Sequence, residues 1–223
     1  MKKNVTGIVL VAGNSTRYGK GKNKNFEKVH GKSLLHYSLK VMDSVSAIRD
    51  ILIVIREEDR ETVQKILKQE KLEKPVQLVV GGSSRMESVS HALEATDSSY
   101  VVIHDGARPV IKKRMIVDAL RALKTFSGAV VGVPSKDTIK IVDGNGVVTS
   151  STKRDCTWCS QTPQCFDREV LWALHQKYKD CPSITDDAML LEKEGYPVQM
   201  IRGEYTNIKV TTREDLMIVS HYL

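Results

Sequence analysis

A glycine-containing loop near the start of the chain has the residue types that bind phosphate. The loop follows the β-branched run Ile8–Val11 and contains Gly13 and Arg17. Glycine lets a backbone turn sharply and present successive N–H groups to an anion, whose charge Arg17 and the nearby Lys24 can neutralise. A plain turn with solvated lysines has a similar composition. The loop therefore predicts a phosphate site only in combination with motifs further along the chain.

Two more polar motifs follow apolar segments that read as strands. The segment Gly81–Val89 offers glycines for close backbone approach and hydroxyl groups at a predicted helix start, although a simple capped turn would use the same residues. In His104–Pro109, the carboxylate of Asp105 comes directly after a buried strand and suits Mg²⁺ bound through a phosphate. A salt bridge between Asp105 and Arg108 is the alternative interpretation.

Further polar motifs occur in the last third of the chain. They are Gln161–Gln164, Thr185–Asp187 and Asn207–Thr211. Each alone could be a turn or a helix cap. Polar strand ends that converge on one crevice are hard to explain as packing, so the motifs together predict a ligand site.

Strand-like and helix-like segments alternate along most of the chain, which indicates βαβ units. The predicted strands are Val5–Val11, Ile51–Ile55, Val76–Val80, Tyr100–Ile103 and Ala129–Val133. The predicted helices are Leu34–Met42, Arg60–Leu72, Met86–Ala95 and Lys113–Leu123. With right-handed crossovers these segments form an α/β fold with a doubly wound, mostly parallel sheet, whose ligands lie beyond the carboxyl ends of the strands.

The alternation stops after Pro134, where residues 137–155 read as two polar-faced strands around the turn Asp143–Gly146. An isolated two-stranded ribbon is marginal in water. We therefore expect a β-hairpin arm that protrudes from the sheet and is held by a partner subunit. The remaining predicted elements are a helix from about Asp167, a helix starting at Thr185, strands near Val198–Ile201 and Asn207–Val210, and a helix from about Thr212 with capping-box spacing at Thr211–Glu214.

Length and composition favour a single-domain metabolic enzyme over residues 1–223. The formal net charge of +7 suits a polyanionic partner, but aromatic residues make up only 5% and the basic residues are mixed with acidic ones, so nucleic acid is not the expected partner. No apolar run reaches the length of a membrane span, which predicts no membrane partner. The pair Cys156 and Cys159 lacks a second ligand pair for zinc, and we expect reduced thiols in a cytoplasmic protein.

The motifs resemble, in order, those of the 2-C-methyl-D-erythritol 4-phosphate cytidylyltransferases. They are Val-Ala-Gly-x-x-x-Arg, Lys24, Gly-Gly-x-x-Arg-x-x-Ser-Val, His-Asp-Gly-Ala-Arg-Pro, Asp-Thr-Ile-Lys, Gln-Thr-Pro-Gln-x-Phe, Thr-Asp-Asp-Ala and Asn-Ile-Lys-Val-Thr. The resemblance runs from about Ile8 to Leu216 and implies a Rossmann-like nucleotidyltransferase fold. It also implies transfer of CMP from CTP to 2-C-methyl-D-erythritol 4-phosphate, with release of pyrophosphate, in non-mevalonate isoprenoid biosynthesis. Finally, it implies Mg²⁺ or another divalent cation and a homodimer with exchanged arms.

Roles are implied residue by residue. Catalytic charge stabilisation falls to Arg17, Lys24 and Lys209. Nucleotide binding falls to Val11, Ala12, Gly13, Gly82, Ser83, Ser88 and Gly106. Binding of the sugar-alcohol phosphate falls to Asp105, Arg108, Thr138, Arg154, Thr162, Thr185 and Thr211, with Thr138 and Arg154 supplied by the other subunit and Asp105 also as the metal ligand.

The first loop departs from the family pattern, because Val11, Ser15 and Tyr18 replace an alanine, a glycine and a methionine. The family's Pro-Lys-Gln reads Asn23–Asn25 here, with Lys24 in register. A ribitol-5-phosphate cytidylyltransferase is the alternative of the same chemistry. A dinucleotide-binding module lacks its Gly-x-Gly-x-x-Gly spacing, and a non-catalytic nucleotide- or RNA-binding protein is the alternative of another class.

Overall fold

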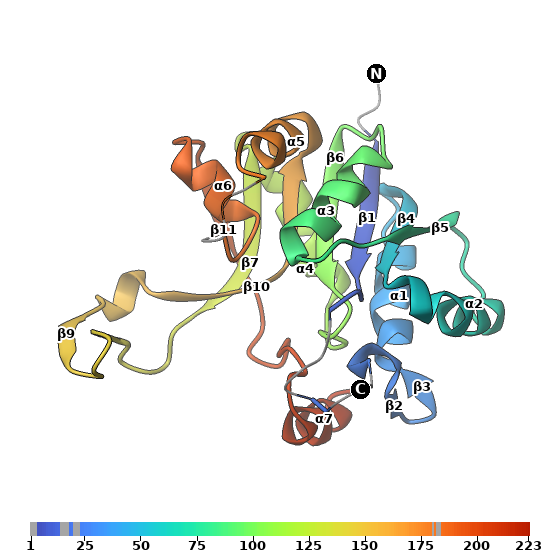
Figure 1. Ribbon diagram of the computed structural model, residues 1–223, viewed down its shortest axis with the longest axis horizontal. Coiled ribbons are helices and arrows are strands. Elements are labelled where there is room, and N and C mark those ends of the chain that lie inside the picture. Colours follow the sequence, from blue (N-terminus) through green and yellow to red (C-terminus); the bar gives the residue numbers. More distant parts are fainter. Residues whose placement is uncertain (1–3, 14–17, 20–22, 180, 182–183) are drawn as a thin grey trace.

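The computed structural model describes residues 4–13, 18–19, 23–179, 181 and 184–223, and over these residues a seven-stranded sheet forms the centre of the fold (Figure 1). Its strands are β1 (Val5–Leu10), β4 (Ile48–Ile55), β5 (Val76–Val80), β6 (Tyr100–Asp105), β7 (Gly128–Pro134), β10 (Trp158–Asp167) and β11 (Val198–Arg202). The order is β11-β7-β10-β6-β1-β4-β5. Only β10 runs antiparallel to its neighbours in this sheet, so the predicted mostly parallel α/β sheet is confirmed.

Helices cover both faces of the sheet, as a doubly wound fold requires (Figure 1). One face packs against α1 (Leu34–Ser44), α2 (Arg60–Gln69) and α4 (Lys113–Ala122). The other face packs against α3 (Arg85–Glu94), α5 (Arg168–Lys177) and α6 (Ala188–Lys193). Successive strand residues point to opposite faces, so the fully buried Val9 joins the first core and Ile8 the second. The carboxyl ends of the strands are thereby fixed between two apolar layers.

Strand β10 was not predicted, because Ser160, Gln161 and Thr162 are polar and Pro163 lacks the N–H that a central strand donates. The ladder between β10 and β7 is irregular between Ser160 and Gln164, and this irregularity accommodates the proline. Regular pairing with β6 begins only at Gln164, opposite Ile103. A polar stretch is therefore held in the middle of the sheet, next to the end of β6.

Three predicted elements after β10 need correction. Thr185 does not start a helix, because α6 begins at Ala188, after a turn in which the Asp186 carboxylate accepts the N–H of Met189. Residues 207–210 form no strand and run as an irregular connection. The last helix, α7 (Arg213–Ser220), begins close to its predicted start, but its N-cap is Thr212 and its capping box closes on Asp215, one residue later than the predicted Thr211–Glu214 spacing.

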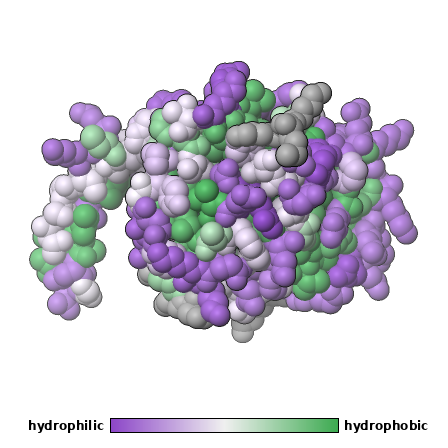
Figure 2. Space-filling view, turned by 90° about the horizontal axis from the view of Figure 1, so that it is seen from above, coloured by the Kyte–Doolittle hydropathy of each residue, from purple (hydrophilic) through white to green (hydrophobic). Residues whose placement is uncertain are grey.

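The predicted hairpin arm is present. Strands β8 (Lys140–Val142) and β9 (Val148–Ser151) pair only with each other and extend away from the sheet (Figure 1). The arm carries apolar side chains that are about half exposed, namely Ile139, Ile141, Val142, Val147 and Val148. Figure 2 shows hydrophobic surface on the projection at one end of the molecule. This apolar surface has no cover within the described part of the chain.

Two smaller findings concern the sequence predictions about membranes and thiols. Among the described residues, no helix combines the length and the apolar character needed to cross a bilayer. Cys156 and Cys159 are exposed free thiols, and Cys165 is a free thiol buried in the core.

Candidate active site

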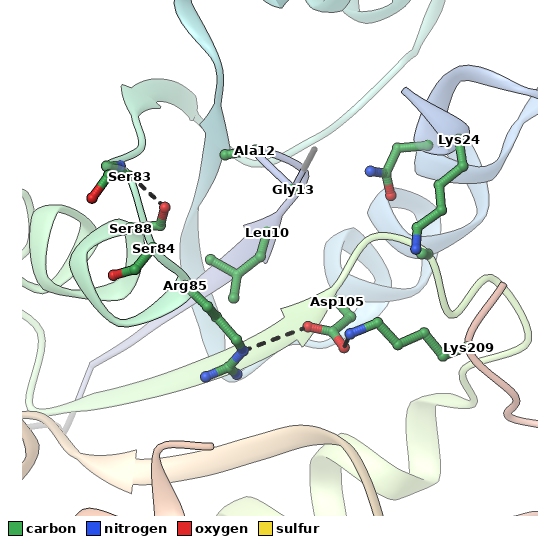
Figure 3. Close-up of a pocket in the computed structure, with 13 residues that line it drawn as sticks. Leu10, Ala12, Gly13, Lys24, Ser83, Ser84, Arg85, Ser88, Asp105 and Lys209 are labelled. Atoms are coloured by element: carbon green, nitrogen blue, oxygen red, sulfur yellow. Dashed lines mark hydrogen bonds and ion pairs between the residues drawn. The ribbon is translucent and has the colours of Figure 1, made fainter. Parts of the chain in front are cut away.

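A pocket of about 280 Å³ opens at the carboxyl ends of β1, β5 and β6 (Figure 3). The residues that line it come from the loops after these strands, from the segment around Lys24 and from the connection before α7. They are Leu10, Ala12, Gly13, Lys24, Asn25, Gly82, Ser83, Ser84, Arg85, Ser88, Asp105, Ala107 and Lys209. Segments far apart in the sequence therefore meet where a doubly wound sheet places its ligands.

Half of the described residues with an implied role line this pocket. Those that do are Ala12, Gly13, Lys24, Gly82, Ser83, Ser88, Asp105 and Lys209. Those described but outside the lining are Val11, Gly106, Arg108, Thr138, Arg154, Thr162, Thr185 and Thr211. Arg17 lies outside the described residues.

The ion pairs of the pocket converge on Asp105. Its Oδ2 lies 2.7 Å from Nζ of Lys209 and 3.9 Å from Nε of Arg108, and its Oδ1 lies 4.0 Å from Nε of Arg85. Burial raises the pKa of this carboxyl, but Lys209, Arg85 and Arg108 outweigh burial and hold the pKa well below its usual range. Asp105 is therefore ionised, and Lys209 is a closer partner than the Arg108 considered from the sequence.

Thr162 is 4% exposed and uses its hydroxyl to hold the end of β6. This oxygen accepts the N–H of Asp105 at 3.1 Å and lies 2.8 Å from Nδ1 of His104. The Nε2 atom of His104 lies 3.1 Å from the carbonyl oxygen of Arg108, which can only accept. His104 is thus a neutral imidazole that donates from Nε2 and accepts the Thr162 hydroxyl at Nδ1. Thr162 therefore fixes the position of Asp105 without lining the pocket itself.

The buried imidazole predicts an acid-sensitive fold. Burial lowers the pKa of His104 to about 4, whereas an unfolded chain protonates histidine near its ordinary value. The unfolded state then binds more protons below neutral pH, so this stability is present above about pH 6.5 and is lost as the pH falls. Urea unfolding without nucleotide or divalent cation should show a loss of about 2 kcal/mol between about pH 7 and pH 5 from this group.

The control for this measurement is His104→Asn, which is expected to unfold more easily but without the histidine-dependent slope in that pH range. An equal slope in the variant and the natural protein would contradict the assignment of a neutral His104.

The loop after β5 is built by reciprocal hydrogen bonds. The Ser88 hydroxyl accepts the N–H of Gly82 at 3.1 Å, and the Glu87 carboxylate accepts the N–H and the hydroxyl of Ser83 at 2.6 and 2.7 Å. The N-cap Ser84 accepts the N–H of Glu87, so the capped turn considered from the sequence is present. The same turn lines the pocket with serine hydroxyls at the start of a helix, where negative charge is favoured.

Gly106 and Val11 support the pocket without lining it. A Cβ atom on Gly106 would lie 2.6 Å from Cγ1 of Val11 and 2.9 Å from Oδ1 of Asn25. Asn25 is 3% exposed and lines the pocket, and no described residue forms a hydrogen bond with its Oδ1. Glycine at position 106 thus makes room for this amide beside Lys24.

Gly106→Ala is therefore expected to destabilise the protein by about 1–3 kcal/mol, because the new methyl group overpacks a buried contact. Gly144→Ala is the matched control, since a Cβ there meets nothing within 4 Å. Thermal unfolding of both variants provides the measurement. Equal midpoints for the two variants would show that the loop at Asn25 moves aside without cost.

The other implied substrate residues occupy different surroundings. The Arg108 guanidinium is mostly buried and donates to the carbonyl oxygen of Asn207 at 2.9 Å. Thr211 donates its N–H to Asp215 at the start of α7, and the Thr185 hydroxyl is exposed and faces Met189. These contacts place none of these side chains in the described pocket.

The two residues implied to act in the other subunit lie on or beside the arm. Thr138 is exposed, and Arg154 is exposed with its guanidinium donating to the carbonyl oxygen of Lys136. Neither lines the pocket of its own chain.

Sequence reasoning missed Arg85 and Asn25 as pocket residues. Arg85 stands in the Gly-Gly-x-x-Arg motif, and Asn25 follows Lys24, so both were visible as motif members. The sequence could not show that their side chains reach the pocket, since that depends on how α3 and the Lys24 segment dock on the sheet.

The donor set of the pocket fits Mg²⁺ bound together with phosphate. Asp105 is the only carboxylate among the described residues that line the pocket, and no described cluster of three His, Cys, Asp or Glu side chains could hold an ion by itself. Mg²⁺ commonly uses one or two carboxylates and completes its shell with phosphate oxygens and water. An ionised Asp105 beside cationic side chains meets that requirement.

Comparisons with known proteins agree with this architecture. The family model described as IspD, 2-C-methyl-D-erythritol 4-phosphate cytidylyltransferase, matches residues 5–223. The enzyme of that name from Caldanaerobacter subterraneus subsp. tengcongensis is 38% identical, with 99% of each chain covered. The one from Clostridium novyi is 39% identical, with 97% of this chain and 94% of the relative covered.

Solved structures show the same likeness. The crystal structure of 4-diphosphocytidyl-2C-methyl-D-erythritol synthase from Anaerococcus prevotii superposes with a TM-score of 0.88 at 31% identity, covering 100% of this chain and 99% of that chain. The 2-C-methyl-D-erythritol 4-phosphate cytidylyltransferase from Thermus thermophilus gives a TM-score of 0.75 at 26% identity, with 96% of each chain covered. The family model over residues 5–223 and the relatives at 38–39% identity show that the chain belongs to the 2-C-methyl-D-erythritol 4-phosphate cytidylyltransferase family.

Proposed function

We propose that the pocket above β1 and β6 binds CTP and 2-C-methyl-D-erythritol 4-phosphate and joins them. The reaction transfers CMP to the acceptor phosphate and gives 4-diphosphocytidyl-2-C-methyl-D-erythritol and pyrophosphate. As a member of its family, the chain is a CTP-dependent cytidylyltransferase of isoprenoid biosynthesis.

One observation supports placing this reaction in the pocket. Lys24 and Lys209 come from segments far apart in the chain, and they line one pocket with the glycine loops after β1 and β5. Lysine charges beside backbone N–H groups of glycine loops form the kind of site that phosphate groups occupy. Asp105 lies 2.7 Å from Lys209 and adds the carboxylate that a divalent cation requires.

The mechanism needs no general base, because the acceptor phosphate is anionic at neutral pH. Its oxygen attacks the α-phosphorus of CTP in line with the departing pyrophosphate. Lys24 and Lys209 stabilise the charge that gathers on the phosphate oxygens, as Arg17 is proposed to do. His104 is buried and committed to Thr162 and Arg108, so it holds the end of β6 and takes no proton from the substrate.

Other proposed roles follow the motif assignments. Ala12, Gly13, Gly82, Ser83 and Ser88 hold the cytidine end. Asp105 would hold Mg²⁺, which neutralises charge on the phosphates when bound. Arg108, Thr185 and Thr211 would reach the sugar-alcohol phosphate only after a local rearrangement of the contacts described above.

The arm completes the proposed assembly. Residues 137–155 project from the sheet with an uncovered apolar surface, which supports a homodimer in which each arm covers the partner. Arg154 and Thr138 would then serve the partner's pocket. A cytoplasmic location remains a prediction from the sequence. So does the expectation that neither nucleic acid nor a membrane is a partner.

Pyrophosphate release tests the acceptor. The natural protein with CTP and Mg²⁺ should release pyrophosphate with 2-C-methyl-D-erythritol 4-phosphate and remain at background with ribitol 5-phosphate. Release with ribitol 5-phosphate alone would agree with the proposed nucleotide site but would contradict the proposed acceptor substrate. A gel shift at physiological salt without bound RNA would remove the RNA-binding alternative.

A further inference from the structure

A row of ionisable side chains runs from the core behind the pocket to the pocket lining. Nε2 of His175, on α5, lies 3.1 Å from Oδ1 of Asp187, at the start of α6. Oδ2 of the same carboxylate accepts from Nη1 of Arg85, at the start of α3, at 2.7 Å. Nε of Arg85 faces Oδ1 of Asp105 at 4.0 Å. Three helices on one face of the sheet thus connect to the central aspartate of the pocket.

The back of this row is closed to water. Asp187 and His175 are each 1% exposed. A carboxylate can only accept, so Nε2 of His175 carries a proton. Its Nδ1 is buried and has no hydrogen-bond partner among the described residues. Burial raises the pKa of Asp187, but Arg85 and His175 outweigh burial and lower it, so the group stays ionised. Asp187 therefore presents a fixed negative charge to Arg85.

The front of the row is open. The Arg85 side chain lines the pocket and is 31% exposed, although Asp187 binds it tightly. Figure 3 shows it extending from the turn that contains Ser84 and Ser88 toward Asp105. Nη1 of its planar guanidinium donates to Asp187 and Nε faces Asp105, while Nη2 can donate two further hydrogen bonds to a ligand. This place lies between the proposed cytidine end and the proposed phosphate end of the pocket.

A purely structural ion pair explains these features less well. Burying a charge pair costs desolvation and adds little net stability compared with apolar residues of similar size. The row also leaves a buried imidazole nitrogen unpaired, which is a further cost. The desolvation cost and the unpaired nitrogen are both explained if the buried groups serve to hold the arginine side chain in one orientation at the open pocket.

We propose that Arg85 is a further catalytic residue that binds the α-phosphate region of CTP, and that Asp187 and His175 are positioning residues that fix its guanidinium. This inference rests on the proposed function and deepens it. Arg85 adds a cation on the side of the pocket opposite Lys209, with Asp105 between them.

The test combines CTP binding by calorimetry with steady-state kinetics under saturating substrates. Arg85→Gln should weaken CTP binding about 10-fold and lower kcat about 100-fold, since a phosphate contact is lost. Asp187→Asn should lower kcat about 10-fold, but by less than about 2-fold when Arg85→Gln is already present. His175→Gln should lower kcat in the same direction by a smaller factor, and Asp187→Glu should restore part of the loss.

Asp43→Asn is the matched control, because Asp43 is also a buried carboxylate but accepts the backbone N–H groups of Glu73 and Lys74 away from the pocket. It should lower the unfolding midpoint and leave kcat unchanged. Equal effects of Asp187→Asn with and without Arg85, or lost stability at unchanged kcat, would overturn the inference. A natural protein that binds CTP through Arg85 but transfers nothing to the acceptor would overturn the proposed acceptor alone.

Discussion

Replacing Lys209 with alanine is expected to lower kcat/KM for cytidylyl transfer by about 10²- to 10³-fold. The Lys209 ammonium reaches into the pocket and lies 2.7 Å from Oδ2 of Asp105. Its removal takes away a cation that stabilises the transition state and leaves Asp105 facing the incoming phosphates with less compensation. Both effects raise the barrier of the chemical step, so kcat should fall more than affinity for CTP.

Lys65→Ala is the control, because it also removes one positive charge and one lysine side chain. Lys65 lies 3.8 Å from Glu61 in an exposed ion pair on α2, and such pairs contribute little. Its kcat/KM should equal that of the natural protein. A Lys209→Ala enzyme that keeps more than about a third of the natural kcat/KM would contradict the proposed role.

Mixing two inactive variants should restore about a quarter of the natural activity if the site is shared between subunits. Lys24→Ala disables the pocket of its own chain, whereas Arg154→Ala disables the arm that it offers to its partner. About half of the randomly mixed dimers pair one variant with the other, and each such dimer contains one complete site. Co-expression with two affinity tags, followed by pyrophosphate release, measures the restored activity.

Each variant mixed with itself serves as the control and should stay inactive. Failure of the mixed dimer to exceed these controls would show that Arg154 acts within its own chain or not at all. A molecular mass of one chain by light scattering would contradict the exchanged arms directly.

The sequence predicted the parallel part of the sheet well, because its strands are short, apolar and separated by amphipathic helices. It missed β10, where polar residues and Pro163 argue against a central strand when read alone. The irregular pairing between Ser160 and Gln164 is a property of two strands together and leaves no local signal. The strand predicted at residues 207–210 failed for the converse reason, since its apolar residues pack without joining the sheet.

The same division applies to the site. Asp105 could be selected because its motif places a carboxylate directly after a predicted strand, whereas Lys24 and Lys209 were assigned from the resemblance to the family. The sequence could not show that the Thr162 hydroxyl forms a hydrogen bond with His104 outside the pocket, nor that Arg85 donates a hydrogen bond to Asp187. These contacts join residues 58 and 102 positions apart, so only the folded chain reveals which polar side chains face the pocket.

The stereochemical course of transfer tests the central claim most directly. CTP carrying sulfur on its α-phosphorus is incubated with 2-C-methyl-D-erythritol 4-phosphate, Mg²⁺ and the natural protein, and the product is analysed by phosphorus NMR. Direct in-line attack by the acceptor phosphate predicts one equivalent of pyrophosphate and a product with inverted configuration at that phosphorus. Retained configuration, which requires a covalent intermediate on the protein, or the absence of product would contradict the account.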